Sequence, residues 1–465
     1  MDRIFKKIGV ALLANIINAV ATFVISFIVP RMVTVEEYGY FQVYFFYVTY
    51  VGFFHFGLCD GILLKEGGRK YSDLNYKSYS AQFYLMVLMD GIIAALISCV
   101  AAMYPLSEEY RYVYILASLN IVVLCAQAFL LYILQATSRI KEYSTITISY
   151  RLFSVVCYLI MYILGVANVY ALVMIDFLGK LLSVLIGLYW CKEITAARPR
   201  VNKVVLCELK ENVQIGSQIL FANVSSILTS GIVKMGIQFR WSIETYAKVS
   251  LAITLTNVFM TVVNAVSLVL YPTLRNQPEE RLKSLYPSLR NILFYPVCLC
   301  LAFYYPMQKL ICWWLPQYSE SRGYLALLFP LCIFITKSSM LVITYLKVLR
   351  EEKAILRSNI VGILFAVVTT IVSVVVFENL QLAVLSILVN TIVRTVVAEH
   401  KLAKYTGHNI KANVAIELFV SAVFVISHTA FNGIFGLIVY GATLLVVCFV
   451  NRSEILLSFK QLLQK

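Results

Sequence analysis

The strongest constraint on this chain lies near its start, where residues 8–30 contain no charged side chain. About 20 consecutive apolar residues are enough for a helix to cross the hydrocarbon core of a bilayer. The stretch therefore predicts a membrane-spanning helix. A short polar turn, Arg31–Gly39, follows it, and then apolar sequence resumes. We expect the chain to cross the membrane repeatedly.

Composition supports this interpretation. Hydrophobic residues make up 61% of the chain and charged residues only 14%, with a mean hydropathy of +0.82, whereas soluble domains are about 25% charged. The predicted fold class is an all-α polytopic membrane protein. The 11 cysteines lie singly along apolar runs, so we expect buried hydrophobic side chains rather than disulfides or zinc ligands. Short loops, the lack of a phosphate-binding loop and scattered histidines predict no enzyme, metal site or cofactor.

The apolar runs predict 14 spans. The first is Ile8–Pro30, and the others lie near residues 40–64, 81–105, 112–135, 144–166, 170–191, 213–235, 247–271, 288–307, 323–348, 355–378, 380–400, 413–431 and 433–450. Cytoplasmic loops carry an excess of Lys and Arg. With the N-terminus inside, the inside loops hold 28 basic residues and the outside loops hold 6. We therefore expect both termini to be cytoplasmic. The net charge of +15 then faces anionic lipid headgroups rather than a nucleic acid.

The second half of the chain repeats the first. Ala14-Asn15 recurs as Ala222-Asn223, and at the same shift of 208 residues the turn residues Val35, Glu36 and Tyr38 become Ile243, Glu244 and Tyr246. A shared pattern at one period indicates duplication. At a shift of 211, Glu109, Arg111 and Arg139 fall on Glu320, Arg322 and Arg350.

Because the repeats lie an even number of spans apart, they are parallel, and two spans are added at the C-terminus. The predicted parts are a bundle at 1–191, a basic connector at 192–212, a second bundle at 213–403 and an added segment at 404–465. Within the connector, Val204–Leu209 is expected to form a short amphipathic helix.

Charged residues inside the spans are the candidate functional residues, because a charge in hydrocarbon is costly and usually faces a partner or a wet cavity. The candidate anion-binding residues are Lys180, Lys337, Arg394, Arg151 and Lys234. The candidate ion-coupling residues are Asp90, Asp176, Asp60 and Glu417. Lys337 and Arg394 lie deep without an obvious local partner, so we expect them to face a cavity that attracts an anion such as a phosphate.

Some of these residues have a structural alternative. Asp176 and Lys180 are four residues apart on one helix with the acid first, which favours an ion pair. Arg151, Lys234, Asp60 and Glu417 lie near the ends of their spans, where charged groups can reach the membrane interface. Asp90 lies deep and is either a proton or cation site or a partner for one of the bases.

Several short motifs resemble the Wzx-type polysaccharide flippases, relatives of the MATE exporters and lipid II flippases. They are Ala14-Asn15…Pro30, Val35–Phe41, Phe56–Gly61, Leu315–Tyr318, Phe329-Pro330 and Tyr345–Arg350. The resemblance implies a V-shaped, two-lobe protein of the bacterial inner membrane. It implies that undecaprenyl-diphosphate-linked oligosaccharides are moved by alternating access, driven by H⁺ or Na⁺. It also implies a polysaccharide polymerase and a chain-length regulator as candidate partners.

Two other functions remain open. A MATE-like exporter of cationic compounds would need an acidic cavity, yet basic residues outnumber acidic ones in the spans. A membrane-embedded polysaccharide polymerase generally has a long outside loop for catalysis, and the outside loops here are short. A flippase is therefore the favoured interpretation.

Overall fold

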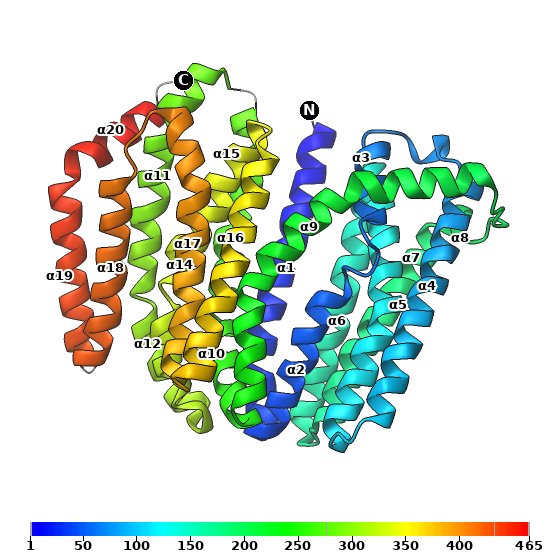
Figure 1. Ribbon diagram of the computed structural model, residues 1–465, viewed down its shortest axis with the longest axis horizontal. Coiled ribbons are helices and arrows are strands. Elements are labelled where there is room, and N and C mark those ends of the chain that lie inside the picture. The colour runs from blue at the N-terminus through cyan, green and yellow to red at the C-terminus, as the bar shows by residue number, and fades with distance from the viewer. Residues whose placement is uncertain (1, 276, 432, 464–465) are drawn as a thin grey trace. The chain divides into compact units, whose positions relative to one another are not determined.

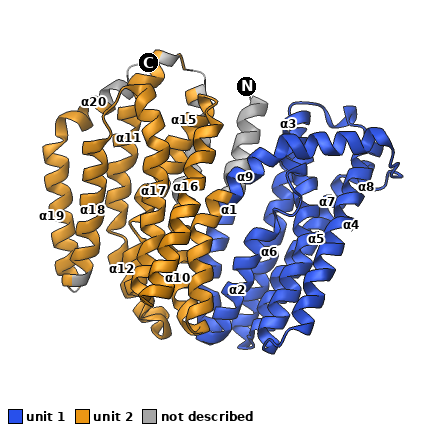
Figure 2. Cartoon of the chain, in the orientation of Figure 1, with its two compact units in different colours: residues 1–224 blue, residues 225–465 orange. Residues whose placement is uncertain are grey.

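A computed structural model describes residues 2–275, 277–431 and 433–463. The side chains of residues 2–15, 261–273, 275, 279, 429 and 459–463 lie outside this description. The described residues form helices and turns without a strand (Figure 1), which confirms the predicted all-α class. The chain divides into two compact units, unit 1 (residues 1–224) and unit 2 (residues 225–465) (Figure 2). The expected four-part division stays a prediction.

Unit 1 is built around one central helix. Helix α5 packs against α2, α3, α4 and α7, and 67% of its most apolar window is buried, compared with 22% for α4 and 17% for α6. The faces of α4 and α6 that α5 does not cover are apolar and exposed, as expected for helices that meet lipid. The helices are α1 (Asp2–Met32), α2 (Val35–Val51), α3 (Leu58–Glu66), α4 (Tyr76–Met103), α5 (Glu108–Ala136), α6 (Ile140–Leu164), α7 (Val169–Trp190), α8 (Lys192–Thr195) and the first part of α9 (Lys203–Arg240).

Unit 2 has a central span as well, but it is irregular. Its most apolar window is 78% buried, and it consists of α13 (Ser321–Leu328), α14 (Leu331–Thr336), a π-helical turn at Lys337–Val342 and α15 (Ile343–Val348). A π-helical turn inserts an extra residue into a helix and often marks a functional position. The other helices are α10 (Ile243–Arg275), α11 (Glu279–Leu301), α12 (Tyr304–Trp314), α16 (Glu352–Thr370), α17 (Leu380–Thr406), α18 (Lys411–Ala430), α19 (Ile434–Val450) and α20 (Arg452–Leu463).

Ten helical segments of the described residues are long and apolar enough to cross a membrane, or 11 if the bent pair α19–α20 counts as one span. The count of 14 spans stays a prediction, in part because some side chains of α1 and α10 lie outside the description. The span expected near residues 40–64 is broken into α2 and α3. Phe56 and Gly57 between them have φ values of +50° and +89°, which a continuous right-handed helix cannot contain.

Equivalent turns of the two repeats have the same local structure. The hydroxyl of Thr34 accepts a hydrogen bond from the backbone N–H of Glu37 at 3.2 Å, and the Glu37 carboxylate accepts one from the backbone N–H of Thr34 at 3.1 Å. At the shift of 208, the Ser242 hydroxyl accepts from the N–H of Thr245 at 3.3 Å. Both are N-caps, which satisfy otherwise unpaired N–H groups at a helix start. The duplicated motif therefore starts a helix in each copy.

The connector continues directly into the following span. Residues 203–240 form the single 38-residue helix α9, so the prediction of a short separate helix at Val204–Leu209 is wrong in its extent. Polar contacts fix the first part of α9 on α3 and α4. Lys65 forms an ion pair with Glu211 at 2.6 Å, the Ser78 hydroxyl donates to Glu208, and the Asn212 amide donates to Gln82 at 3.0 Å.

Glycines allow α3 and α9 to cross with their backbones in contact. A Cβ atom on Gly216 would lie 1.9 Å from the carbonyl oxygen of Gly57, and one on Gly61 would lie 1.9 Å from the carbonyl oxygen of Asn212. Neither side chain could be accommodated by rotating a flexible group, because the contacts are backbone atoms. The crossing therefore requires glycine at both positions.

We predict that Gly216→Ala destabilises unit 1 by about 1–3 kcal/mol, the usual cost of overpacking. Gly91 of α4 is the control, because no atom lies within 4 Å of a Cβ placed there. Gly91→Ala should be neutral or slightly stabilising, since alanine favours a helix. The measurement is thermal unfolding of the purified protein in detergent, and equal melting temperatures for the two variants would contradict the glycine crossing.

Candidate functional site

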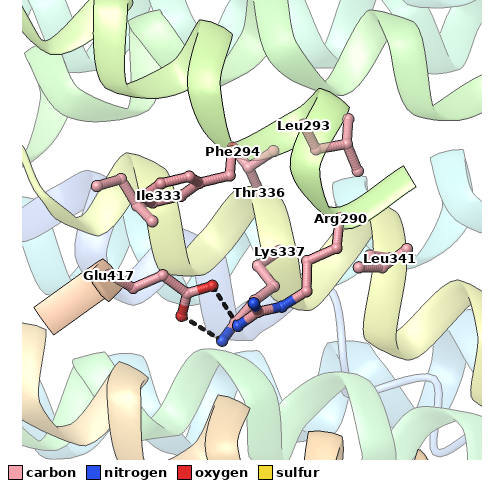
Figure 3. Close-up of a pocket in the computed structure, with 8 residues that line it drawn as sticks. All are labelled: Arg290, Leu293, Phe294, Ile333, Thr336, Lys337, Leu341 and Glu417. Carbon is pink, nitrogen blue, oxygen red and sulfur yellow. Dashed lines mark hydrogen bonds and ion pairs between the residues drawn. The ribbon is translucent and has the colours of Figure 1, made fainter. Parts of the chain in front are cut away.

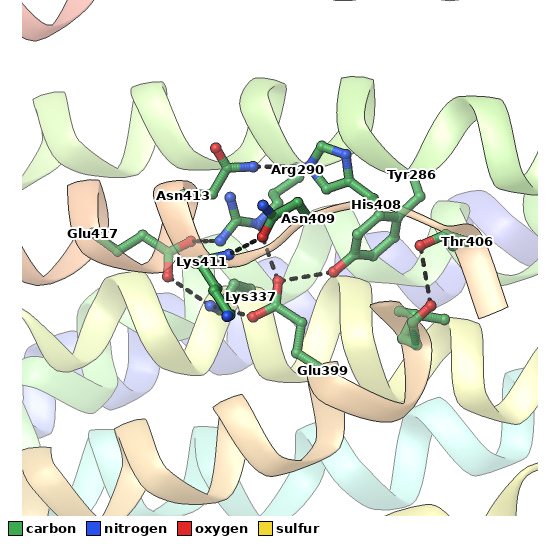
Figure 4. Close-up of polar contacts among 11 residues, drawn as sticks. Tyr286, Arg290, Lys337, Glu399, Thr406, His408, Asn409, Lys411, Asn413 and Glu417 are labelled. Carbon is green, nitrogen blue, oxygen red and sulfur yellow. Dashed lines mark hydrogen bonds and ion pairs between the residues drawn. The ribbon is translucent and has the colours of Figure 1, made fainter. Parts of the chain in front are cut away.

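Four charged side chains of unit 2 form a closed cluster, which we call the charge quartet: Arg290 of α11, Lys337 of the π-helical turn, Glu399 of α17 and Glu417 of α18. Figure 3 shows three of them and Figure 4 shows all four. Arg290 contacts Glu399 at 3.1 Å and Glu417 at 2.6 Å. Lys337 contacts the same two carboxylates at 2.8 and 2.6 Å. Each cation therefore bridges both anions.

Burial makes these contacts important. The four side chains are at most 6% exposed, and the Tyr286 hydroxyl adds a hydrogen bond to Glu399 at 2.9 Å. Removing charges from water is expensive, and the attraction between them compensates only when the remaining donors and acceptors are satisfied. With two cations and two anions, the quartet has no net charge. It joins four helical segments through one set of contacts.

The quartet lies near the α17–α18 turn, which is expected on the cytoplasmic side. Figure 4 shows it beside His408, Asn409 and Lys411 of that turn. A ring nitrogen of His408 lies 3.0 Å from the amide nitrogen of Asn413. Burial, followed by the positive charge of Arg290, lowers the pKa of His408. A protonated His408 would add a third cation beside the quartet.

Two small cavities flank the contact between Arg290 and Glu417. One, of about 10 Å³, is lined by both residues and by Phe294, Ile333 and Lys337, among others (Figure 3). The other, also of about 10 Å³, lies between α11, α18 and the α19–α20 junction and includes Asn413, Asn451 and Glu454. The C-terminal segment thus helps to enclose the quartet through α18, Asn451 and α20. Glu417 itself comes from α18.

Unit 1 has a simpler buried charge pair. Asp176 and Lys180 of α7 form the ion pair that their spacing predicted, with side chains 4% and 6% exposed. The Tyr44 hydroxyl donates to Asp176 at 2.8 Å and accepts from the Asn120 amide at 2.9 Å. The ammonium of Lys180 also lies 5.3 Å from the centre of the Tyr44 ring and 5.6 Å from that of Phe45, within the range of cation–π attraction.

Arg394 of α17 has a different environment. Its guanidinium donates to the carbonyl oxygen of Ser226 at 3.2 Å and to the Ser226 hydroxyl. Gly362 of α16 makes room for the stem, because a Cβ atom there would lie 3.2 Å from the Arg394 side chain. Among the described residues no carboxylate lies within ion-pair distance of it. Its positive charge is therefore not neutralised by an acid.

The other predicted residues make separate contacts, although Arg151 lies near enough to Lys180 to interact with its charge. Arg151 stacks over the Tyr150 ring at 4.8 Å, and Lys234 lies 5.8 Å from the centre of the Tyr246 ring. Asp60 accepts a hydrogen bond from Tyr132 at 3.4 Å and lies 3.9 Å from His55. Asp90 is fully buried. Within the described part of the chain, no three acidic, cysteine or histidine side chains are placed to hold a metal ion.

The sequence interpretation missed Arg290 and Glu399. Both lie at the predicted edges of spans, so Arg290 was assigned to a cytoplasmic loop and Glu399 was not considered. The partners of Lys337 are distant in sequence: Glu399 and Glu417 lie 62 and 80 residues away in the chain. The presence of charged residues near the ends of those spans could have indicated such a cluster. Their positions along the sequence do not show which residues pair with each other.

Together, these features define a multi-pass, all-helical membrane protein made of two bundles with internally paired charges. Its fold matches that of a lipid II flippase, MurJ in an inward closed conformation, with a TM-score of 0.67, 13% identity and coverage of 97% of this chain and 100% of that one. It also matches an inward-facing multidrug resistance MATE transporter, with a TM-score of 0.64, 13% identity and coverage of 85% and 96%. At these identities the likeness shows the fold.

The chain belongs to the family described as polysaccharide biosynthesis proteins, which it matches over residues 4–276. Another structural match is a MOP superfamily transporter from Pyrococcus furiosus, with a TM-score of 0.52, 14% identity and coverage of 87% and 97%. None of the curated proteins with which the sequence was compared matches it. The resemblance inferred from the sequence motifs is confirmed in family and in fold.

We predict that Lys337→Met destabilises unit 2 by about 3–5 kcal/mol, because it leaves two buried carboxylates with one cation, Arg290, and so one negative charge uncompensated. Lys401→Met is the control, since Lys401 pairs with Glu351 at 3.1 Å on the surface, where a pair contributes about 0–1 kcal/mol. Thermal unfolding measures both. A second Glu417→Met change should recover part of the loss, because it restores a neutral cluster. Equal effects of Lys337→Met and Lys401→Met would contradict this account.

A second prediction concerns pH. Because the folded-state pKa of His408 is lowered, the folded protein binds fewer protons than the unfolded chain, whose histidines titrate near about pH 6.5. The contribution of His408 to the free energy of unfolding is therefore present above that pH and is lost as the pH falls below it. His408→Gln should therefore reduce the drop in melting temperature between about pH 7 and pH 5. If the melting temperature of the variant falls with pH as much as that of the wild type, His408 does not interact with the charges of the quartet.

Proposed function

We propose that this protein is a transporter that flips undecaprenyl-diphosphate-linked oligosaccharide units across the bacterial inner membrane. Transport would proceed by alternating access and would be coupled to an ion gradient. The family and the fold support the general class, and the distribution of buried charge supports an anionic substrate. A polysaccharide polymerase and a chain-length regulator are the partners that would act on the flipped units.

The observation that carries the proposal is the environment of Arg394. It is a cation within a membrane span, and among the described residues no carboxylate neutralises it. Its present partners, the carbonyl and hydroxyl of Ser226, are neutral acceptors that an anionic ligand could replace. Guanidinium groups bind phosphate through a planar set of donors. Arg394 therefore suits the diphosphate of a lipid-linked sugar.

The lysines that form internal ion pairs could bind substrate only after those pairs are broken. Lys180 and Lys337 bind carboxylates, so a diphosphate could bind either lysine only if it displaced an internal acid. Arg151 lies against the Tyr150 ring, and an aromatic ring competes with an anionic ligand for a cation much less than a carboxylate does. We therefore rank Arg394 and Arg151 as primary anion-binding residues, keep Lys234 as a further candidate, and expect Lys180 and Lys337 to act after a conformational change.

The two alternative functions fit the charge distribution less well. A MATE-like exporter of cationic compounds would need accessible acids, but Asp176 and Glu417 already bind internal cations. A membrane-embedded polymerase would need residues placed for glycosyl transfer, and the short outside turns between the described helices leave little room for them.

The test is genetic complementation. With the gene deleted, lipid-linked units should accumulate on the cytoplasmic leaflet and surface polysaccharide should fall, and the wild-type gene should restore both. Arg394→Ala should reduce flipping about tenfold or more, the value expected for losing one charged hydrogen-bonded contact. Its abundance in the membrane should not change. Arg394→Lys should restore part of the activity, and Arg357→Ala, at an exposed position on α16, should have no effect.

The same experiment separates the alternatives. Single units that reach the outer leaflet but are not joined would indicate a polymerase. Unchanged polysaccharide with increased sensitivity to cationic drugs would indicate an exporter. Normal flipping by the Arg394→Ala protein would contradict the assignment of the anion site.

A further inference from the structure

Asp90 is the one predicted acidic site residue without a partner. It lies midway along α4 (Tyr76–Met103) and its side chain is fully buried. Among the described residues, neither of its carboxyl oxygens has a hydrogen-bond partner. One turn further along α4, Ala94 packs in a small apolar cluster with Val51 and Ile121. These apolar side chains offer a negative charge no stabilisation.

The other three predicted acids each have at least one polar partner. Asp176 has Lys180 and the Tyr44 hydroxyl. Glu417 has two cations in the quartet. Asp60 has the Tyr132 hydroxyl at 3.4 Å and the His55 ring at 3.9 Å. All four acids are buried. Asp90 therefore differs from the other three in lacking a partner within the described part of the chain and not in its burial.

The titratable groups around Asp90 are two thiols and one histidine. On α5, the Cys125 thiol is close enough to Asp90 for a weak interaction, but it donates to the carbonyl oxygen of Val51 at 3.7 Å. A thiol is at most a weak donor and does not replace a cation. On the α2–α3 side, Cys59 is near both Asp90 and Asp60. The nearby histidine, His55, uses Nδ1 to accept from the backbone N–H of Gly57. None of these groups carries a positive charge that would stabilise an anion at Asp90.

An isolated carboxylate in a low-dielectric interior is so costly that the group takes up a proton instead. We propose that Asp90 is a proton-binding site, neutral in the conformation of this structure and ionised when the contact between α4 and α5 admits water. The step is a simple exchange: the carboxylate binds one H⁺ from one side of the membrane and releases it to the other. This inference rests on the proposed function for its role, because it identifies the coupling ion as H⁺ and its carrier as Asp90.

The first test needs no substrate. Melting temperature of the purified full-length protein is measured against pH for the wild type, for Asp90→Asn and for Asp73→Asn, an exposed control. If folded Asp90 keeps its proton while the unfolded chain loses it, the wild type must lose stability as pH rises. Asp90→Asn mimics the protonated form, so it should remove that loss and be at least as stable as the wild type at high pH. Asp73→Asn should behave as the wild type.

Three results would overturn the proposal. Asp90→Asn could be less stable at every pH with an unchanged pH dependence, which would mean that Asp90 is ionised or structural. Sodium could raise the melting temperature of the wild type but not of Asp90→Asn at constant pH, which would mean that the site binds Na⁺. The infrared band of a protonated carboxyl group could be the same in both proteins, which would mean that Asp90 carries no proton.

A second test links the site to transport. In vesicles, a proton gradient should speed flipping by the wild type, whereas Asp90→Asn should flip at the same rate with and without the gradient. An equal response to the gradient in both proteins would overturn the coupling role. If Asp90 titrates as predicted but the deletion strain makes normal polysaccharide, the proton site stands and the proposed function fails. If flipping is confirmed but Asp90 does not titrate, the proposed function stands and the proton site fails.

Discussion

A charge buried in a membrane bundle needs a partner of opposite sign, and this requirement organises both halves of the protein. In unit 2, Arg290 and Lys337 each bridge Glu399 and Glu417, so four helical segments are held by one neutral cluster. Because such a cluster is costly to leave half-formed, it favours one arrangement of these helices over others. The added C-terminal helices are fixed to the bundle by the same interaction, since Glu417 belongs to α18.

Charge pairing also separates structural residues from those that are available to a ligand. In unit 1 the ion pair of Asp176 and Lys180 is closed by Tyr44 and Asn120, so it resembles the quartet in being satisfied internally. Arg394 differs because its partners are neutral, and Asp90 differs because neither oxygen has a hydrogen-bond partner among the described residues. An unneutralised base suits an anionic substrate, and an unpartnered acid suits a proton. Under the proposed function, Arg394 and Asp90 would bind the two species that a coupled transporter must carry.

Much of the fold could be predicted from the sequence because its physical causes are local. Apolar length predicts helices, and the spacing of Asp176 and Lys180 predicts their ion pair. The repeated turn predicts a duplication, and the N-caps at Thr34 and Ser242 show that its two copies share a local structure. The quartet could not be predicted, because its contacts join residues 62–127 positions apart in the chain. In addition, two of its residues, Arg290 and Glu399, lie at the ends of predicted spans. The break between α2 and α3 was missed for a similar reason: it depends on backbone torsions at Phe56 and Gly57, in a stretch that reads as continuously apolar.

The most direct test of this account is translocation by the purified protein in liposomes. A fluorescent polyprenyl-diphosphate oligosaccharide is placed in one leaflet, and its appearance in the other is followed by quenching. The account predicts rapid transfer by the wild type, and greatly slowed transfer by a folded Arg394→Ala protein whose melting temperature is unchanged. Transfer of a polyprenol that lacks the diphosphate at the same rate would contradict it, because the anion would then play no part in recognition.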